Sequence, residues 1–510
     1  MGDHSPRLKS DGDVIDRWMD SLGPSQFIQA LVVSLAWMFD AQQTFISVFA
    51  DRSPNWHCIN TTTMDYDSQC SSAKTFCDIP RRSWSWDEPS DVSTVSDWDL
   101  DCYGAVISVV GFPASAFFAG CIVGGFLLAS LGDTTLGRKK MLCFATFVMS
   151  SIGLLTAFSP NVLVYSFLRF LTGIARATIG TSALVLATEI VGSRWRGRVG
   201  VIGFSFFTFG FLSLPAISYA TQAPWRALYI WTSLPSFFYS IVISFYTYES
   251  PRWLLVRGRR EEAIRILNSM GSSSNGNYSV EIATSFFDEL NDSDPKVDDC
   301  NNDAGTNLYS ALKLLFKSRW ALRRMAGVIT VGFGVGFLYY GLPLAVGNLD
   351  VDLNLIITLN AISEFPSLIL TILYVDQIKR KTTMLLITTT TGAASLACVF
   401  VHNTSVQIAI EVSAFFGIIT AFNLMLIYTL ELFPTCVRNS AVAMMRQAQF
   451  LGGVFSPIMV AVGKSDGDFW SFGVFGLIIG FCGLPVIFLP ETRSMPICDT
   501  MEQQEQEATL

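Results

Sequence analysis

The sequence predicts an all-α polytopic membrane protein whose twelve transmembrane helices form two halves of six. Twelve long apolar stretches, most with few charged residues, lie between Gln26 and Pro490. A stretch of about 18–25 apolar residues crosses a bilayer as a helix, because lipid cannot satisfy exposed backbone groups. Composition agrees, since 51% of the 510 residues are hydrophobic and only 15% are charged. Soluble domains average about 25% charged residues.

The predicted spans form two sets of six on either side of a long polar segment. The first set covers residues 26–49, 103–131, 140–158, 161–190, 199–220 and 228–248, and the second covers 326–345, 353–375, 382–400, 405–430, 441–462 and 469–489. We therefore expect a tail (1–25), a first half (26–248), a linker (249–325), a second half (326–489) and a second tail (490–510).

Lysines and arginines in the short loops predict the orientation of the chain. They gather on one side in the turns at 138–140, 194–198 and 379–381 and in the linker, whereas the opposite side has few outside one large loop. Short cytosolic loops carry an excess of these residues, so we expect both termini to be cytosolic. The polar, acidic first 25 residues predict no cleavable signal peptide. No basic face suited to nucleic acid is present.

The large loop, roughly 50–102, faces the opposite, extracytoplasmic side in this scheme. It holds four of the 11 cysteines, Cys58, Cys70, Cys77 and Cys102. Cysteines clustered in an oxidising compartment predict two disulfides with three alternative pairings, and four free thiols are the other interpretation. The loop also holds a glycosylation acceptor at Asn60. Either the plasma membrane or the vacuolar membrane offers such a compartment.

Two turns on the basic side repeat the same chemistry six spans apart. Asp133 and Arg138 follow span two, and Asp376 and Arg380 follow span eight. Contacts between such a carboxylate and arginine can latch helices together and break when the halves move. Each turn alone is explained by ordinary anchoring of basic residues, but the recurrence in matching positions favours a latch.

These repeated turns resemble the major facilitator superfamily, whose Gly-x-x-x-Asp-Arg-x-Gly-Arg-Lys loop recurs in the same places. In this chain Thr134 replaces the arginine, one residue is inserted before Gly137, and Lys379 stands where glycine is usual. The resemblance implies a twelve-helix fold and alternating access between the halves. It also implies coupling or gating roles for Asp133, Arg138, Arg169, Glu189, Glu249, Arg252, Asp376, Arg380, Glu431 and Arg438.

Other segments narrow the resemblance. Residues 249–254 and 431–439 resemble the sugar-porter and organic-ion-transporter branches of the superfamily. Residues 84–87 and 97–102, in the cysteine-bearing loop, are similar to the organic cation/carnitine transporters, and residues 40–44 are similar to the plant members. The chain is thus identified as resembling a plant-type organic cation/carnitine transporter over nearly its whole length.

Glu364 in span eight is the first candidate for binding substrate. An ionisable group at a helix centre costs about 2.5–3.5 kcal/mol, which favours a functional role. Pro366 follows closely and loosens the local backbone hydrogen bonding. The resemblance implies that a Glu-x-Pro here lines the substrate site, where a carboxylate attracts an ammonium group. The alternative is a helix–helix hydrogen bond from a protonated glutamate.

Two further positions are candidates on similar grounds. Tyr339 matches an aromatic that lines the cavity in the family, and aromatic faces attract quaternary ammonium groups; simple packing is the other interpretation. Asp40 lies near mid-depth in span one. It can be a proton carrier, a second anchor for a cation, or the ion-pair partner of Arg176 or Arg446.

Arginines inside the spans suggest a second charge in the cavity. Phe450 stands where cation transporters of the family often carry aspartate and anion transporters arginine, and Arg446 lies one turn earlier. A zwitterion such as carnitine then has Glu364 for its ammonium and Arg446 or Arg176 for its carboxylate. Glu411 in span ten is a further ionisable residue without an assigned role.

The expected function is transport of organic cations or carnitine, either secondary active or driven by membrane potential. The sequence has no phosphate-binding Gly-x-x-x-x-Gly-Lys-[Ser/Thr] loop. We expect a monomer in the bilayer that binds no cofactor or metal. A proton or a sodium ion can be coupled to transport, for example by symport. The alternatives are a proton-coupled sugar or organic anion porter and a non-transporting receptor. An enzyme is disfavoured, because all three histidines lie outside the spans.

Overall fold

The computed structural model of the chain describes most of the predicted spans. It covers residues 23–59, 83–102, 109–128, 136–222, 224–270, 317–348, 351–374, 377–401, 403–466 and 470–493, with a few isolated positions elsewhere. The residues predicted at Asn60, Cys70, Asp133 and Asp376 lie outside the described residues.

The first half consists of helices that follow the predicted spans. They are α2 (Pro24–Ser34), α3 (Ala36–Phe45), α4 (Ser47–Ala50), α7 (Phe112–Leu128), α8 (Arg138–Thr156), α9 (Val162–Arg176), α10 (Ile179–Glu189), α11 (Arg196–Thr221) and α12 (Trp225–Tyr246), with a short 3-10 turn, η4 (Ser193–Trp195). Helices α2 to α4 together form one span, and α9 and α10 form another. Asn161 starts α9 by accepting a hydrogen bond from the backbone N–H of Val164 at 2.9 Å.

The second half repeats this arrangement. It consists of α17 (Arg319–Ala345), η6 (Val346–Asn348), α18 (Leu353–Tyr374), α19 (Arg380–Phe400), α20 (Thr404–Leu432), α21 (Thr435–Asp466), α22 (Trp470–Gly483) and η7 (Leu484–Phe488). In the described part of the chain, 10 helical spans are long and apolar enough to cross a membrane, and α7 and α21 complete the twelve. The predicted all-α membrane fold is confirmed.

Helix ends differ from the predicted spans where polar residues continue a helix. Helix α17 starts at Arg319 rather than at residue 326, and α21 starts at Thr435 rather than at residue 441. Hydropathy marks only the part of a helix that matches hydrocarbon, whereas backbone hydrogen bonding continues beyond it into polar surroundings.

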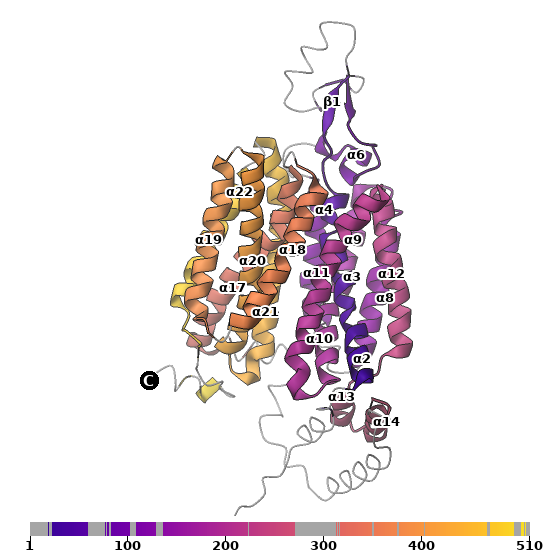
Figure 1. Cartoon of the computed structure of the whole chain (residues 1–510), viewed down its shortest axis with the longest axis vertical. Helices are drawn as coiled ribbons and strands as arrows, with labels where there is room; N and C mark the ends of the chain where they lie inside the picture. The colour runs from indigo at the N-terminus through magenta and orange to yellow at the C-terminus, as the bar shows by residue number, and fades with distance from the viewer. Residues whose placement is uncertain are drawn as a thin grey trace, which may run out of the picture.

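Figure 1 shows the two halves side by side, with different segments beyond the two ends of the first half. One end, here called the hairpin end, carries strands β1 (Trp56–Cys58) and β2 (Trp84–Trp86), which pair antiparallel. Helix α6 (Thr94–Trp98) and η2 (Leu100–Cys102) follow. The other end, here called the linker end, carries α13 (Pro251–Val256) and α14 (Arg260–Met270).

A disulfide and polar contacts hold the hairpin-end loop. Cys77 and Cys102 form a disulfide, one of the pairs that the sequence left open; Cys58 is also disulfide-bonded. Asp51 accepts hydrogen bonds from Thr94 at 2.9 Å and from Tyr165 at 2.8 Å. Burial raises the pKa of the Asp51 carboxyl.

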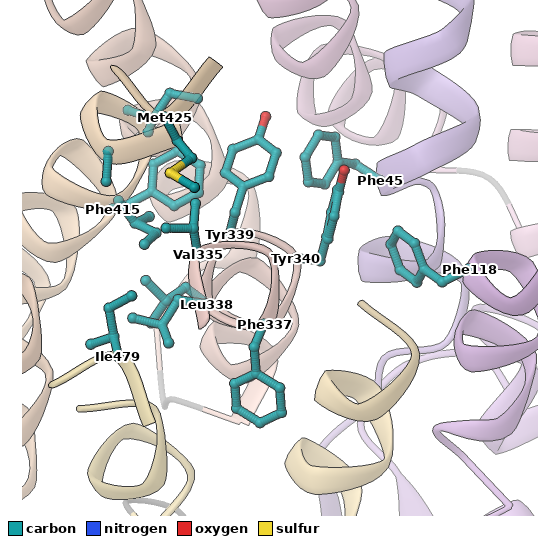
Figure 2. Packing of buried hydrophobic residues seen from close by; sticks show 14 of the residues in the cluster. Phe45, Phe118, Val335, Phe337, Leu338, Tyr339, Tyr340, Phe415, Met425 and Ile479 are labelled. Atoms are coloured by element: carbon teal, nitrogen blue, oxygen red, sulfur yellow. The ribbon is translucent and has the colours of Figure 1, made fainter. Parts of the chain in front are cut away.

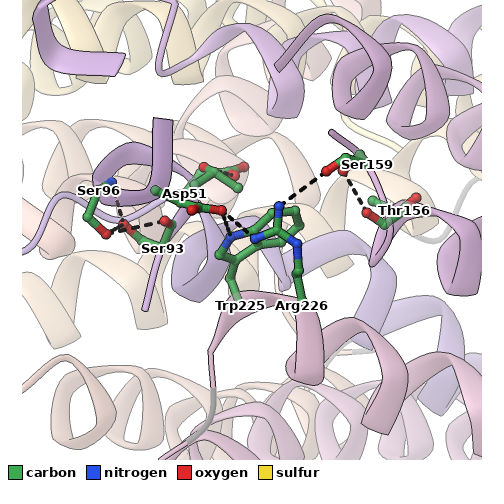
Figure 3. Close-up of polar contacts among 9 residues, drawn as sticks. Asp51, Ser93, Ser96, Thr156, Ser159, Trp225 and Arg226 are labelled. Atoms are coloured by element: carbon green, nitrogen blue, oxygen red, sulfur yellow. Dashed lines mark hydrogen bonds and ion pairs between the residues drawn. The ribbon is translucent and has the colours of Figure 1, made fainter. Parts of the chain in front are cut away.

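A second set of contacts joins the loop to α12. Asp97 forms an ion pair with Arg226, whose Nη2 also donates to the carbonyl of Ser159 at 3.2 Å (Figure 3). The indole of Trp225 donates to the same Asp97 carboxylate at 3.2 Å. These contacts fix the loop against the first half.

Glycines let paired helices approach closely in each half. A methyl group at Gly173 would lie 2.0 Å from the carbonyl oxygen of Phe117, so α9 contacts the backbone of α7 directly. The second half repeats this contact, since a methyl group at Gly336 of α17 would lie 2.2 Å from the carbonyl oxygen of Gln449 on α21. Small residues at such crossings are typical of membrane helices.

Candidate functional site

A cavity lies between the two halves and is lined by both. The first half contributes Trp37, Asp40, Arg176, Ala177, Gly180, Phe204, Phe207 and Thr208. The second half contributes Tyr339, Tyr340, Glu364, Leu368, Ile419, Phe422, Asn423, Arg446, Gln449 and Phe450. All five residues predicted to bind substrate, Glu364, Tyr339, Asp40, Arg446 and Arg176, are thus brought together in one cavity.

Glu364 joins the two halves through hydroxyl groups. Its Oε2 accepts a hydrogen bond from Thr208 of α11 at 2.8 Å, and its Oε1 accepts one from the hydroxyl of Tyr339 on α17 at 3.0 Å. The side chain is buried. No ion pair to Glu364 is found among the described residues. The carboxylate therefore faces the cavity with neutral partners only.

Asp40 is paired with Arg176, one of the three roles that the sequence left open. The guanidinium donates from Nε to Oδ1 at 2.6 Å and from Nη2 to Oδ2 at 3.1 Å. The Arg176 guanidinium carbon also lies 5.3 Å from the ring centre of Phe450. Bidentate geometry makes this a strong charge-assisted contact, so the carboxylate of Asp40 is occupied by the protein itself.

Arg446 lines the same cavity but, unlike Arg176, is not paired with a carboxylate of the described residues. Within the described part of the chain, its guanidinium makes no hydrogen bond or ion pair, although it lies near enough to Asp40 and Arg176 to interact with their charges. An arginine side chain carries five N–H donors that suit a carboxylate. Arg446 is therefore the arginine of the cavity that is open to a further anionic group.

Aromatic rings surround the two tyrosines of α17. The ring of Tyr339 lies 4.8 Å from that of Phe422 and 5.9 Å from that of Phe415, and Tyr340 lies 4.5 Å from Phe118. Figure 2 shows these tyrosines between Phe415 on one side and Phe118 on the other. Tyr339 thus packs as a buried ring, lines the cavity and presents its hydroxyl to Glu364.

At the linker end, the predicted gating residues of the first half form two contacts. Arg138 at the start of α8 lies 3.5 Å from Glu189 at the end of α10. Glu249 accepts a hydrogen bond from the backbone N–H of Lys139 at 3.0 Å. A carboxylate at this position satisfies a free N–H of the first turn and complements the helix dipole. Arg252 lies in α13 at the same end.

The second half has the same two contacts with better geometry. Arg380 at the start of α19 donates from Nη2 to Glu431 at 2.9 Å and from Nε to the other oxygen at 3.1 Å. Glu491 accepts from the backbone N–H of Arg380 at 2.7 Å. Both arginine contacts join helices within one half, so these latches do not join one half to the other.

Two other predicted gating residues, Arg169 and Arg438, donate to carbonyl or hydroxyl oxygens. Arg169 is fully buried and donates to the carbonyl of Gln43 at 3.2 Å and to the hydroxyl of Ser47 at 3.1 Å. It ties α9 to α3 and α4, and the structure does not bring it together with Glu189. Arg438 donates to the carbonyl of Phe433 at 3.4 Å.

Thr208 is the site residue that sequence reasoning missed. Threonine hydroxyls in membrane helices usually bond to the carbonyl four residues earlier, and Thr208 does so with Phe204 at 3.3 Å. Nothing in the sequence distinguishes it from other span threonines. Its approach to Glu364 depends on how α11 packs against α18.

The fold is that of known membrane transporters. Its solved counterparts include an inward open conformation of the xylose transporter XylE from E. coli, with a TM-score of 0.63, 16% identity, and coverage of 94% of this chain and 99% of that chain. A partially occluded inward open conformation of the same transporter has a TM-score of 0.61 at 15% identity and covers 93% and 99%. These likenesses define the class by its fold, a membrane protein of two six-helix halves with a cavity between them.

Sequence comparison identifies the family. The Major Facilitator Superfamily profile matches residues 95–457. Organic cation/carnitine transporter 3 of Arabidopsis thaliana is 47% identical over 504 residues, with 98% of this chain and 94% of that protein covered. Organic cation/carnitine transporter 2 of the same plant is 46% identical over 514 residues, with 98% and 94% covered. The chain belongs to the plant organic cation/carnitine transporter family of the major facilitator superfamily.

Membership in this family makes the chain a multi-pass membrane transporter and not an enzyme. A receptor that no longer transports is not favoured, and neither is a sugar porter, since relatives that are 39–47% identical over almost the full length are named as organic cation/carnitine transporters.

Proposed function

We propose that the protein carries a small organic cation, or a zwitterion such as carnitine, across its membrane by alternating access. The observation that carries this proposal is Glu364, a buried carboxylate in the cavity between the halves. Its described hydrogen-bond partners are the hydroxyls of Thr208 and Tyr339. A buried anion with neutral partners is best stabilised by a cation, and the substrate supplies one.

The walls near Glu364 suit an ammonium group that carries methyl groups. Trp37, Tyr340 and Phe422 line the cavity. Aromatic faces attract quaternary ammonium ions through the ring quadrupole, by about 0.5–2 kcal/mol for each contact. Methyl groups also favour apolar walls, so this cavity selects alkylated cations over sugars.

Arg446 supports binding of a carboxylate on the same substrate. Of the two arginines that the sequence suggested, Arg176 already binds Asp40 through both carboxylate oxygens. Arg446 has no ion-pair or hydrogen-bond partner among the described residues and faces the same cavity. We therefore assign the carboxylate of a zwitterion to Arg446 and the ammonium to Glu364.

The small size of the cavity supports alternating access. Its free volume is about 70 Å³, and at about 10–15 Å³ for each water it holds about five water molecules. A carnitine-sized molecule therefore requires the halves to separate. Because Thr208 and Glu364 belong to different halves, a cation that binds Glu364 competes with the contact that joins them.

The driving force and the cellular setting are part of the same proposal. A potential of 100 mV supplies about 2.3 kcal/mol for each positive charge, which is roughly 50-fold accumulation without coupling. A proton or sodium gradient can add to it. We place both termini in the cytosol, in the plasma membrane or the vacuolar membrane, with the protein as a monomer.

Uptake by the Glu364→Gln variant tests this function. Wild type, E364Q and the control Glu261→Gln, an exposed glutamate of α14, are compared in proteoliposomes with labelled carnitine, tetraethylammonium and glucose. Because a charge-assisted contact contributes about 1.5–3 kcal/mol, E364Q is expected to reduce cation uptake by about tenfold or more. Equal uptake by E364Q and wild type, or uptake of glucose alone, would reject the proposal. Binding without accumulation would indicate a receptor.

A further inference from the structure

A second carboxylate is buried in the second half, away from the cavity. Glu411 lies about two turns inside α20, near the hairpin end, and is completely buried. Its Oε1 accepts a hydrogen bond from Nδ2 of Asn360 on α18 at 3.0 Å. No lysine, arginine or histidine pairs with it among the described residues. A dry carboxylate without a counter-ion costs several kcal/mol when ionised, so this site fits the neutral acid.

The two unpartnered atoms of this pair suit a bound proton. Oε2 of Glu411 and Oδ1 of Asn360 are both buried, and neither has a hydrogen-bond partner in the described part of the chain. Both are acceptors when Glu411 is ionised. A proton on Oε2 turns it into a donor to the amide oxygen, while the amide N–H already donates to Oε1. The acid and the amide then form a closed ring of two hydrogen bonds, and both atoms are satisfied.

The other titratable groups around α20 do not neutralise Glu411 in place of a proton. Helices α17, α18, α19 and α21 pack against α20. From α19, the thiol of Cys398 interacts with Glu411. Tyr339 of α17, Glu364 of α18 and Arg446 of α21 line the central cavity instead.

Polar side chains lead from the hairpin end to Glu411. Asn403, Gln407 and Glu411 are spaced by four residues and therefore follow one face of α20. Gln407 is buried, and its amide donates to the carbonyl of Cys398 at 3.3 Å. Glu411 lies seven residues from the first residue of α20, which is about 10 Å along the axis. Glu411 therefore lies a short distance from the hairpin end, with polar side chains between.

Two connections link this site to Glu364. Asn360 lies four residues before Glu364, so both lie on the same side of α18, one turn apart. Phe415 lies one turn after Glu411 on α20, and its ring stacks on Tyr339 with centres 5.9 Å apart. The hydroxyl of Tyr339 donates to Glu364. A shift of α18 against α20 on proton binding therefore acts on both groups that form the cation site.

We propose that Glu411 and Asn360 form the binding site of a coupling proton, separate from the cation site at Glu364; this inference rests on the proposed function. In the binding step a proton from water forms an O–H bond with the Glu411 carboxylate, and no other bond is made or broken. Because proton and cation occupy different carboxylates, both can be bound at once. The geometry therefore assigns symport, whereas one shared carboxylate would give exchange of proton for cation.

The test separates coupling from transport. Wild type, Glu411→Gln and Glu364→Gln are reconstituted in proteoliposomes, and two quantities are measured with labelled tetraethylammonium. One is exchange at equal pH on both sides, and the other is accumulation driven by an inward proton gradient with the membrane potential clamped. A glutamine can form the same two-bond ring with Asn360 but carries no titratable proton. E411Q is therefore expected to lose gradient-driven accumulation by about tenfold and exchange by far less, whereas E364Q loses both.

Each outcome bears on one proposal. Accumulation by E411Q equal to wild type, or wild-type accumulation that ignores the proton gradient, overturns the proton site. Failure of the wild type to exchange any organic cation overturns the proposed function instead. Glu411→Asp is the second variant, for use where E411Q does not fold. The pH midpoint of its driven accumulation is expected to shift, because the proton-binding group itself has changed, and an unmoved midpoint overturns the proposal.

Discussion

The guanidinium of Arg176 holds both carboxylate oxygens of Asp40, at 2.6 and 3.1 Å. The side chains are only 7% and 4% exposed, and the pair joins α3 to the end of α9. Because these charges neutralise each other, the remaining charges of the cavity are a cation at Arg446 and an anion at Glu364. These two charges are opposite in sign to the carboxylate and the ammonium of a zwitterion.

We expect Asp40→Asn to destabilise the protein, because it leaves the Arg176 guanidinium buried without its counter-ion. Breaking a buried pair on one side costs about 3–5 kcal/mol, which thermal unfolding in detergent measures. The double variant Asp40→Asn/Arg176→Gln removes both charges and is expected to recover most of the loss. A single variant as stable as the wild type would show that the pair does not hold α3 to α9.

Arg446→Gln is expected to change substrate choice rather than transport as such. Loss of a charge-assisted contact to a carboxylate costs about 1.5–3 kcal/mol, so the affinity for carnitine should fall by about tenfold or more. Tetraethylammonium has no carboxylate and should bind at least as well as before. Competition binding measures both, with Arg265→Gln, an exposed arginine of α14, as control. An equal fall for both ligands would contradict the assignment.

Much of the fold could be predicted because hydropathy is a local property of the sequence. The twelve spans follow from apolar length alone, whereas Glu364 was predicted from the cost of a carboxylate inside a span together with the family resemblance of its Glu-x-Pro segment. The choice between Arg176 and Arg446 as partner of Asp40 could not be predicted. It depends on the rotation of α9 and α21 about their axes, which no local pattern sets.

The partners of the linker-end arginines could not be predicted from the sequence for the same reason. The structure pairs Arg380 with Glu431, 51 residues away, a partner that the sequence did not specify. Thr208 was missed for a related reason, since its contact to Glu364 arises only when the halves meet. Contacts between helices distant in sequence therefore required the structure.

The two linker-end contacts predict unequal effects of removing their glutamates. Glu431 accepts two hydrogen bonds from Arg380 and one from Thr492 at 2.5 Å. Glu189 lies 3.5 Å from Arg138, and its Oε2 has no hydrogen-bond partner among the described residues. We expect Glu431→Gln to cost about 1.5–3 kcal/mol and Glu189→Gln below about 1 kcal/mol. Unfolding of the two variants side by side gives the comparison, and equal losses would contradict it.

Gly173→Ala tests the close contact between α7 and α9. The added methyl group would lie 2.0 Å from the carbonyl oxygen of Phe117, a backbone atom that cannot rotate away. The helices must then separate, and overpacking of this kind costs about 1–3 kcal/mol. Gly480→Ala is the matched control, because a methyl group there meets no atom within 4 Å. It also gains helix propensity, by about 1 kcal/mol.

The measurements are the yield of folded protein after detergent extraction and its unfolding temperature. G173A is expected to lower both, and G480A to leave them equal or higher. Since α9 carries Arg176, which binds Asp40 of α3, a shift of α9 away from α7 should also reduce transport by G173A. If G173A and G480A behave alike, α7 has room to move and the direct backbone contact does not fix the position of Arg176 in the cavity.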